Sequence, residues 1–130
     1  MAGIPLNTFR TVTDSVAYMD PAWPNPAYGG NSAPYFVYQA PPGTTGIILY
    51  MQVANADPGN NYTASAWHYR PSTDTWTLIV QNIPVPIADA RVMLGGKLVL
   101  QTADQVYVSG NDVSSGYLKL IVSLLESANQ

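Results

Sequence analysis

His68, the single histidine of the chain, is the first residue with the chemistry of a general base or a metal ligand. It lies between Trp67 and Tyr69 in a strand-like segment. One histidine excludes a His-pair metal site, no serine has the glycine-flanked nucleophile-elbow pattern, and the absence of cysteine excludes thiol chemistry. We therefore interpret His68 as a packed or interface aromatic residue.

The carboxylates are the next candidates, since paired acids can hydrolyse glycosides and clustered acids can bind calcium. Most fall at predicted turns, where their side chains accept hydrogen bonds from the local backbone. Asp57-Pro58-Gly59-Asn60 together with Asn111-Asp112 could ligate calcium but lacks the regular acidic ladder of a calcium loop. The sequence thus predicts no catalytic, cofactor or metal site, and a protein that is not an enzyme. The acids are Asp14, Asp20, Asp57, Asp74, Asp89, Asp104, Asp112 and Glu126.

Charge is scarce and slightly acidic, with 10% charged residues and a net charge of −3 over 130 residues. The five lysines and arginines are scattered, which argues against nucleic-acid binding. No apolar stretch approaches the roughly 20 residues of a membrane span, and Met1–Pro5 does not begin a signal peptide. We expect a protein made in a cytoplasm that binds neither nucleic acid nor membrane.

Two explanations of the low charge stay open. Part of the surface can be covered by other subunits, because interface cores are depleted of charge. Alternatively, Thr, Ser, Asn and Gln supply the surface polarity.

The secondary structure that carries these residues is predicted to be β-strand, because the dominant hydrophobic period is two. About eight strands with mostly short connections predict an all-β, antiparallel, jelly-roll-like β-sandwich. Pro84 and Pro86 are expected in a connection that crosses between sheets or edges, and Thr102-Ala103-Asp104 in a tight hairpin loop. The expected strands are Thr8–Tyr18, Tyr35–Gln39, Gly46–Asn55, Tyr62–Tyr69, Thr75–Gln81, Leu98–Gln101, Gln105–Ser109 and Tyr117–Leu125.

One domain is expected over residues 1–130, with an irregular proline- and aromatic-rich insertion at residues 20–34. Aromatic residues are enriched at protein interfaces, so this insertion and the segment Ile4–Phe9, a possible arm, are the predicted contacts. Trp67 or Trp76 is expected in the core. The predicted partner-binding residues are Phe9, Trp23, Pro24, Pro26, Tyr28 and Tyr35.

Six segments occur in an order that resembles the small virion structural proteins of tailed bacteriophages, particularly those that infect cyanobacteria. They are Phe9–Thr13, GIILYMQVAN (46–55), TASAWHYRP (63–71), IPVPIADA (83–90), GGKLVLQTADQVYVSG (95–110) and LKLIVSLLES (118–127). The resemblance implies a β-sandwich built into the virion, assembled in the host cytoplasm, with no enzymatic residues and no cofactor.

The role implied by the resemblance is that of a cement or decoration protein that binds the major capsid protein or other virion proteins and stabilises the capsid. We expect it to be a homo-oligomer, such as a trimer. A neck, collar or tail component is the alternative. A carbohydrate-binding module on a fibre or spike is a third reading, because exposed aromatic residues on a β-sandwich can bind sugar rings.

Overall fold

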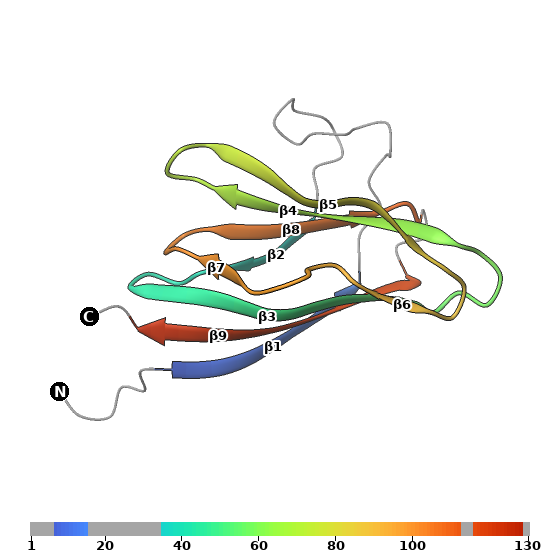
Figure 1. Cartoon of the computed structure of the whole chain (residues 1–130), viewed down its shortest axis with the longest axis horizontal. Helices are drawn as coiled ribbons and strands as arrows, with labels where there is room; N and C mark the ends of the chain where they lie inside the picture. The colour runs from blue at the N-terminus through green and yellow to red at the C-terminus, as the bar shows by residue number, and fades with distance from the viewer. Residues whose placement is uncertain (1–6, 16–34, 113–115, 129–130) are drawn as a thin grey trace.

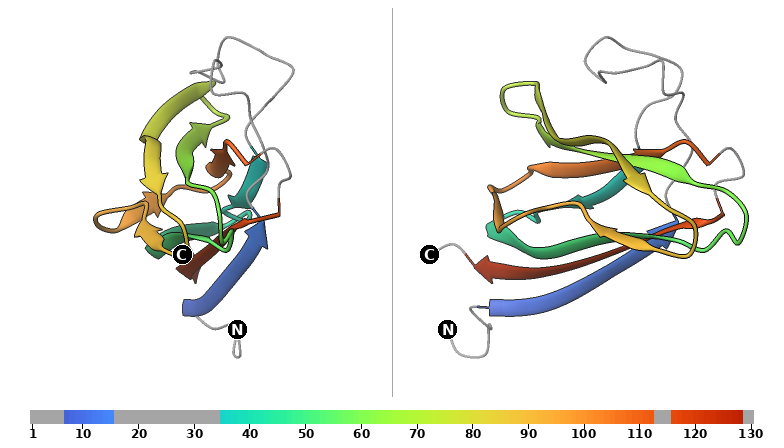
Figure 2. Two further views of the ribbon diagram at one scale, coloured as in Figure 1. Left: turned by 90° about the vertical axis from the view of Figure 1, so that its right-hand side faces the viewer. Right: turned by 45° about the vertical axis from the view of Figure 1, so that its right-hand side comes forward.

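The computed structural model describes residues 7–15, 35–112 and 116–128, and all of their regular structure is β-strand (Figure 1). Two antiparallel sheets pack face to face, as the end-on view in Figure 2 shows. The predicted fold class is therefore confirmed. The strands are β1 (Asn7–Ser15), β2 (Tyr35–Gln39), β3 (Thr44–Asn55), β4 (Tyr62–Arg70), β5 (Thr75–Val85), β6 (Ala90–Val92), β7 (Leu98–Leu100), β8 (Gln105–Gly110) and β9 (Leu118–Ala128).

The strand order is that of a jelly roll. One sheet, sheet A, runs β1-β9-β3, with β6 and β7 both beside β3. The other, sheet B, runs β2-β8-β4-β5. The first and last described strands, β1 and β9, are neighbours in sheet A. The strands between them in the sequence complete sheet A and form the whole of sheet B.

Strands β6 and β7 are two halves of one interrupted edge strand, which accounts for nine strands where eight were expected. Val92 pairs with Gln52 and Leu98 pairs with Ile48. Five residues (93–97) therefore lie opposite three residues of β3 (49–51), so the strand must loop outward there. Strand β6 was not predicted, because its three residues (ARV) form no apolar run, unlike the three residues (LVL) of β7.

The core lies between the sheets and follows the period-two pattern of the strands. Sheet A contributes large aliphatic side chains, and β4 contributes the small residues Ala64 and Ala66. Small residues on one sheet opposite large ones on the other allow close packing of the two layers. The fully buried large residues include Ile48, Met51, Val53, Leu100, Val106, Val108, Leu118, Val122 and Leu124.

Two expected connections differ in the structure. Thr102-Ala103-Asp104 does not close a hairpin, because β7 belongs to sheet A and β8 to sheet B, so the turn crosses between sheets. Leu100 and Val106 both face the core, and this pattern is the same for a hairpin and for a crossing turn. Pro84 lies inside β5 opposite Thr63, a position that an edge strand tolerates. Residues 86–89 make the crossing.

Tyr38 joins the two sheets at one open edge of the sandwich. Its ring lies against Gly46, where an added Cβ would come within 3.4 Å of the ring. Its hydroxyl donates a hydrogen bond to Glu126, and Arg10 forms an ion pair with the same carboxylate at 3.1 Å. Burial, followed by the bond to Glu126, raises the pKa of Tyr38 well above its ordinary value.

We expect Tyr38→Phe to lower the free energy of unfolding by about 1 kcal/mol, because one hydrogen bond between the sheets is lost while the ring remains. Urea denaturation followed by tryptophan fluorescence measures this difference. Above pH 10 the difference in the free energy of unfolding between wild type and Tyr38→Phe should become smaller. The reason is that the pKa of Tyr38 is raised in the folded state, so the stabilisation by its hydroxyl falls as pH rises. A variant as stable as the wild type at pH 7 would contradict the inter-sheet role.

Candidate functional site

His68, Arg70 and Asp104 form a buried polar cluster at the end of β4. His68 Nε2 lies 3.0 Å from Asp104 Oδ2. Arg70 donates to both oxygens of the same carboxylate, over 3.1 Å from Nε and 2.9 Å from Nη2. The backbone N–H of Gln101 donates to Oδ2 over 2.9 Å. Asp104 is 1% exposed, so this carboxylate is buried. Its hydrogen bonds from Arg70, His68 and Gln101 replace those that water would make.

The electrostatics of this cluster favour a fixed, ionised carboxylate. Burial acts to raise the pKa of Asp104, but the hydrogen bonds from Arg70, His68 and Gln101 outweigh it and the pKa is lowered. The bond to Asp104 is the largest cause of the raised pKa of Arg70. The cluster ties β4 to the turn after β7, which is a structural task.

A His–Asp pair is also the orienting half of a nucleophilic triad. In the part of the chain that the structure describes, the hydrogen bond of the His68 ring is the one to Asp104, and none joins it to a hydroxyl. His68 is packed in its strand as the sequence suggested. Asp104 was expected to accept a hydrogen bond from the backbone of its own turn, and it does so from Gln101. Its link to Arg70 joins residues 34 positions apart, and no local pattern signals such a link.

The two turns considered for calcium use their carboxylates for protein contacts. Asp57 accepts hydrogen bonds from Gly59 N, Asn60 Nδ2 and the hydroxyl of Tyr62. The bond from Tyr62 is the largest cause of the lowered pKa of Asp57, and it raises the pKa of Tyr62 to about 12. Asp112 accepts from the backbone of residues 116 and 117. Within the described ranges no three His, Cys, Asp or Glu side chains group together as metal ligands would.

The outer face of sheet A carries a row of apolar side chains that crosses four strands. The register pairs Phe9 with Leu125, Leu125 with Ile47, and Ile47 with Val99. Directly paired residues share a face of the sheet, so these four side chains lie side by side. Phe9 is 75% exposed and Val99 is 54% exposed. We name the outer side of β1, β9, β3, β6 and β7 the apolar face.

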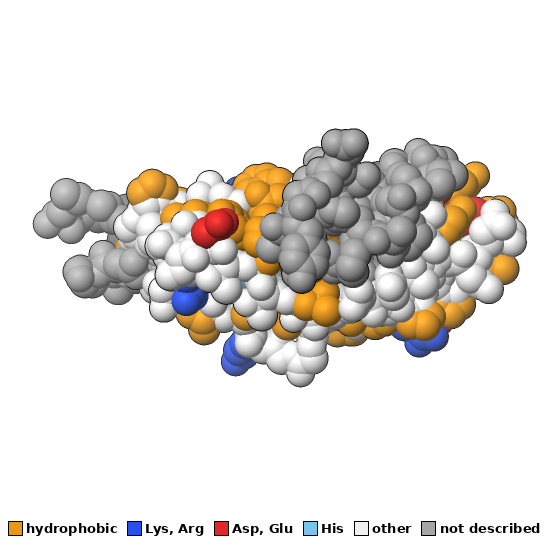
Figure 3. Space-filling model, turned by 90° about the horizontal axis from the view of Figure 1, so that it is seen from above, with side chains coloured by type: hydrophobic (Ala, Val, Ile, Leu, Met, Phe, Trp, Pro, Cys, Tyr) orange, Lys and Arg blue, Asp and Glu red, His pale blue; other side chains and the backbone are white. Residues whose placement is uncertain are grey.

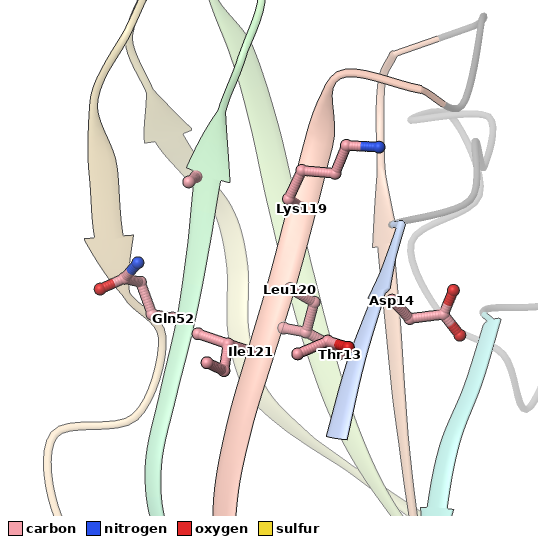
Figure 4. Close-up of a pocket in the computed structure, with 7 residues that line it drawn as sticks. Thr13, Asp14, Gln52, Lys119, Leu120 and Ile121 are labelled. Carbon is pink, nitrogen blue, oxygen red and sulfur yellow. The ribbon is translucent and has the colours of Figure 1, made fainter. Parts of the chain in front are cut away.

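Toward the C-terminal end of β1, the outer side of sheet A becomes polar. A shallow depression there is lined by Thr13, Asp14, Gln52, Lys119 and Ile121, among others, which come from three neighbouring strands (Figure 4). Among the described strand residues whose side chains alternate onto this face, Lys119 is the one charged side chain. The apolar face is therefore almost uncharged, as the core of a protein interface is.

The outer face of sheet B carries an aromatic cluster. The register aligns Phe36 with Tyr107 and Tyr107 with Trp67 across three strands. Trp76 lies 4.4 Å from Tyr69 and 4.9 Å from Tyr107 between ring centroids. Figure 3 views the molecule from the side of β5 and β4, and the visible coloured surface is mainly hydrophobic or uncharged. These rings pack on one another, and carbohydrate binding stays a prediction.

The predicted partner-binding residues divide into three groups. Phe9 is described and is the most exposed of the large hydrophobic side chains on the apolar face. Tyr35 is the first residue of β2, where its backbone pairs with Val108. The four residues expected in the insertion (Trp23, Pro24, Pro26 and Tyr28) lie outside the described residues, as do positions 4–6 of the expected arm.

Sequence reasoning missed most of the apolar face. Ile47, Val99 and Leu125 are far apart in the sequence, and only the strand register brings them beside Phe9. The described residues contain no helix long and apolar enough to cross a membrane. Comparison with known proteins adds no relative, since neither a family model nor a curated protein matches the sequence.

Proposed function

We propose that this chain is a structural protein of a phage particle that binds the assembled capsid through its apolar face and stabilises it. The observation that carries the proposal is the nearly uncharged row Phe9–Leu125–Ile47–Val99 across sheet A, in which Phe9 and Val99 are exposed and Leu125 and Ile47 are half-buried. The jelly roll is also a common architecture of viral capsid domains. The carboxylates at Asp57, Asp104 and Asp112 serve structural contacts, which agrees with a binding role.

The stabilising action follows from mass action. A protein that binds only the assembled shell lowers the free energy of that state, and the effect adds over many copies. A specific interface buries about 1,600 Å² in total. The apolar face spans the width of sheet A, and its side chains are already fixed on strands, so little order has to be gained on binding.

Phe9→Asp is expected to weaken binding to capsids about 100-fold or more, because the substitution places an unpaired charge within a desolvated contact. The assay adds purified protein to particles that lack it and measures the bound fraction by co-sedimentation. Release of packaged DNA on heating then measures the stabilisation of the shell.

The matched control is Phe36→Asp, since Phe36 is the other phenylalanine of the chain and is 46% exposed on the opposite sheet. We expect this variant to bind as the wild type does. Equal loss in both variants, or binding by neither wild type nor control, would overturn the assignment of the apolar face. Few copies per virion, located at one vertex or along the tail, would favour the neck, collar or tail alternative.

A further inference from the structure

Strand β1 forms an unusually open sheet edge. It pairs with β9 without interruption from Asn7 to Ser15 and contains no proline, lysine or bulge, three devices that protect an edge, although it carries two inward-pointing charges of opposite sign, Arg10 and Asp14. Among the described strands, β1 has β9 as its one neighbour. Figure 1 shows β1 as the outermost strand of its sheet.

The other three edges all carry such a device. Strand β2 has five residues and a register shift between Phe36 and Tyr38. Strand β5 contains Pro84, two register shifts and Asn82 at a positive φ of 51°. The fourth edge is broken into β6 and β7, of three residues each. Of the four described edges, β1 is therefore the one with an uninterrupted run of nine paired residues.

We propose that β1 pairs antiparallel with β1 of a second copy, with Val12 opposite Val12 on a two-fold axis. The opposite charges on β1 favour this register over others. Arg10 and Asp14 lie two residues on either side of Val12, so each Arg10 faces the Asp14 of the other copy. Phe9 and Thr11 then lie opposite Ser15 and Thr13, and no two like charges of β1 are paired with each other.

The side chains on β1 are suitably placed for this pairing. Arg10, Val12 and Asp14 share the inward side of the strand, because their partners Leu124, Val122 and Leu120 are buried. The side chain of Arg10 is 49% exposed, and one of its five N–H donors is engaged by Glu126. The guanidinium can therefore bridge Glu126 of its own chain and Asp14 of the second copy.

The first test uses the absence of cysteine in the chain, which makes any introduced thiol unique. Paired residues in antiparallel strands are about 4.5–5.5 Å apart between Cα atoms, within disulfide range. Under mild oxidation Val12→Cys should cross-link to a covalent dimer about tenfold faster than Thr8→Cys. The two Thr8 positions would be separated by eight residues, or roughly 26 Å. Equal rates for both variants would overturn the register.

The second test exchanges the charges. Asp14→Arg and Arg10→Asp should each weaken self-association about tenfold, because like charges then face one another on both sides of the axis. An equimolar mixture of the two variants restores both opposite pairs and should form a heterodimer with wild-type affinity. Analytical ultracentrifugation of the full chain measures all four samples, and circular dichroism checks that the single variants are folded.

A wild-type chain that remains monomeric at high concentration, or a mixture that does not recover association, would overturn the pairing. A trimer in place of a dimer would also do so, since the two-fold register closes with two copies. The experiment needs no phage particle. Its failure is therefore separate from failure of the proposed capsid binding, on which the pairing does not rest.

Discussion

Asp104→Ala is expected to lower the free energy of unfolding by about 3–5 kcal/mol, because removing one member of a buried charged cluster leaves the other members uncompensated. The variant loses the acceptor of hydrogen bonds from His68, Arg70 and Gln101 at once. These contacts connect β4 to the turn between the sheets. Urea denaturation followed by tryptophan fluorescence gives the midpoint and slope for each protein.

Asp89→Ala is the matched control. Asp89 also follows a turn and also contacts an arginine, Arg91, at 3.5 Å, but both side chains are about half exposed. Surface ion pairs contribute about 0–1 kcal/mol, so this variant should stay close to the wild type. A loss at Asp104 no larger than the loss at Asp89 would show that the buried cluster does not hold the fold.

The same cluster sets the response to acid. The folded-state pKa of Asp104 is lowered, so its contribution is complete above the unfolded value of about 3.9 and is lost as pH falls through the folded value. Asp57, whose pKa is also lowered, acts in the same direction. The wild type therefore loses stability below about pH 4, and Asp104→Ala should show a shallower acid dependence in that range.

The sequence predicted the layers of this fold well because its strands alternate cleanly. The inward residues Leu118, Leu120, Val122 and Leu124 have period two, and this pattern distinguished strand β9 from a helix. Pairing is harder to predict, since a crossing turn and a hairpin have the same local chemistry. The turn at Thr102–Asp104 shows this, because only its contacts with Ala40 and Arg70 reveal that it lies between the sheets.

The candidate interface was partly predictable for the same reason. Phe9 is visible as an aromatic residue near the start of a strand, but its neighbours on the apolar face come from three other strands. A surface of this kind depends on register, which the hydrophobic pattern of one strand cannot give. The buried link between Arg70 and Asp104 was hidden by the same long-range pairing.

The two proposed contacts reinforce each other geometrically. Directly paired residues of antiparallel strands point to the same face of the sheet. The two-fold axis between the two Val12 residues is therefore perpendicular to the sheet. Pairing through β1 would place the apolar faces of both copies on one side, as a continuous sheet. The dimer would then offer a capsid twice the apolar surface of one chain, and two weak contacts would act as one stronger contact.

The second large effect is expected at Trp67, which is buried outside the main core. Trp67 is 2% exposed, yet its neighbours in the register are Tyr107 and Leu78 on the outer side of sheet B. It was expected in the core; it is buried, but on the opposite side of its sheet from Ala64 and Ala66. Trp67→Ala should lower the free energy of unfolding by about 3–5 kcal/mol, as large truncations at buried sites do.

Trp76→Ala is the control that separates the effect of burying Trp67 on stability from the effect of its contacts with other aromatic rings. Trp76 belongs to the same cluster and contacts Tyr69 and Tyr107, but it lies half-buried on the edge strand β5. Its loss should cost about 1–2 kcal/mol, mainly the aromatic pairs. Trp67→Phe, which keeps a ring in place, should fall between the two alanine variants in urea midpoint. If Trp67→Ala is as stable as Trp76→Ala, the burial of Trp67 on the outer face of sheet B does not stabilise the fold, and this prediction is wrong.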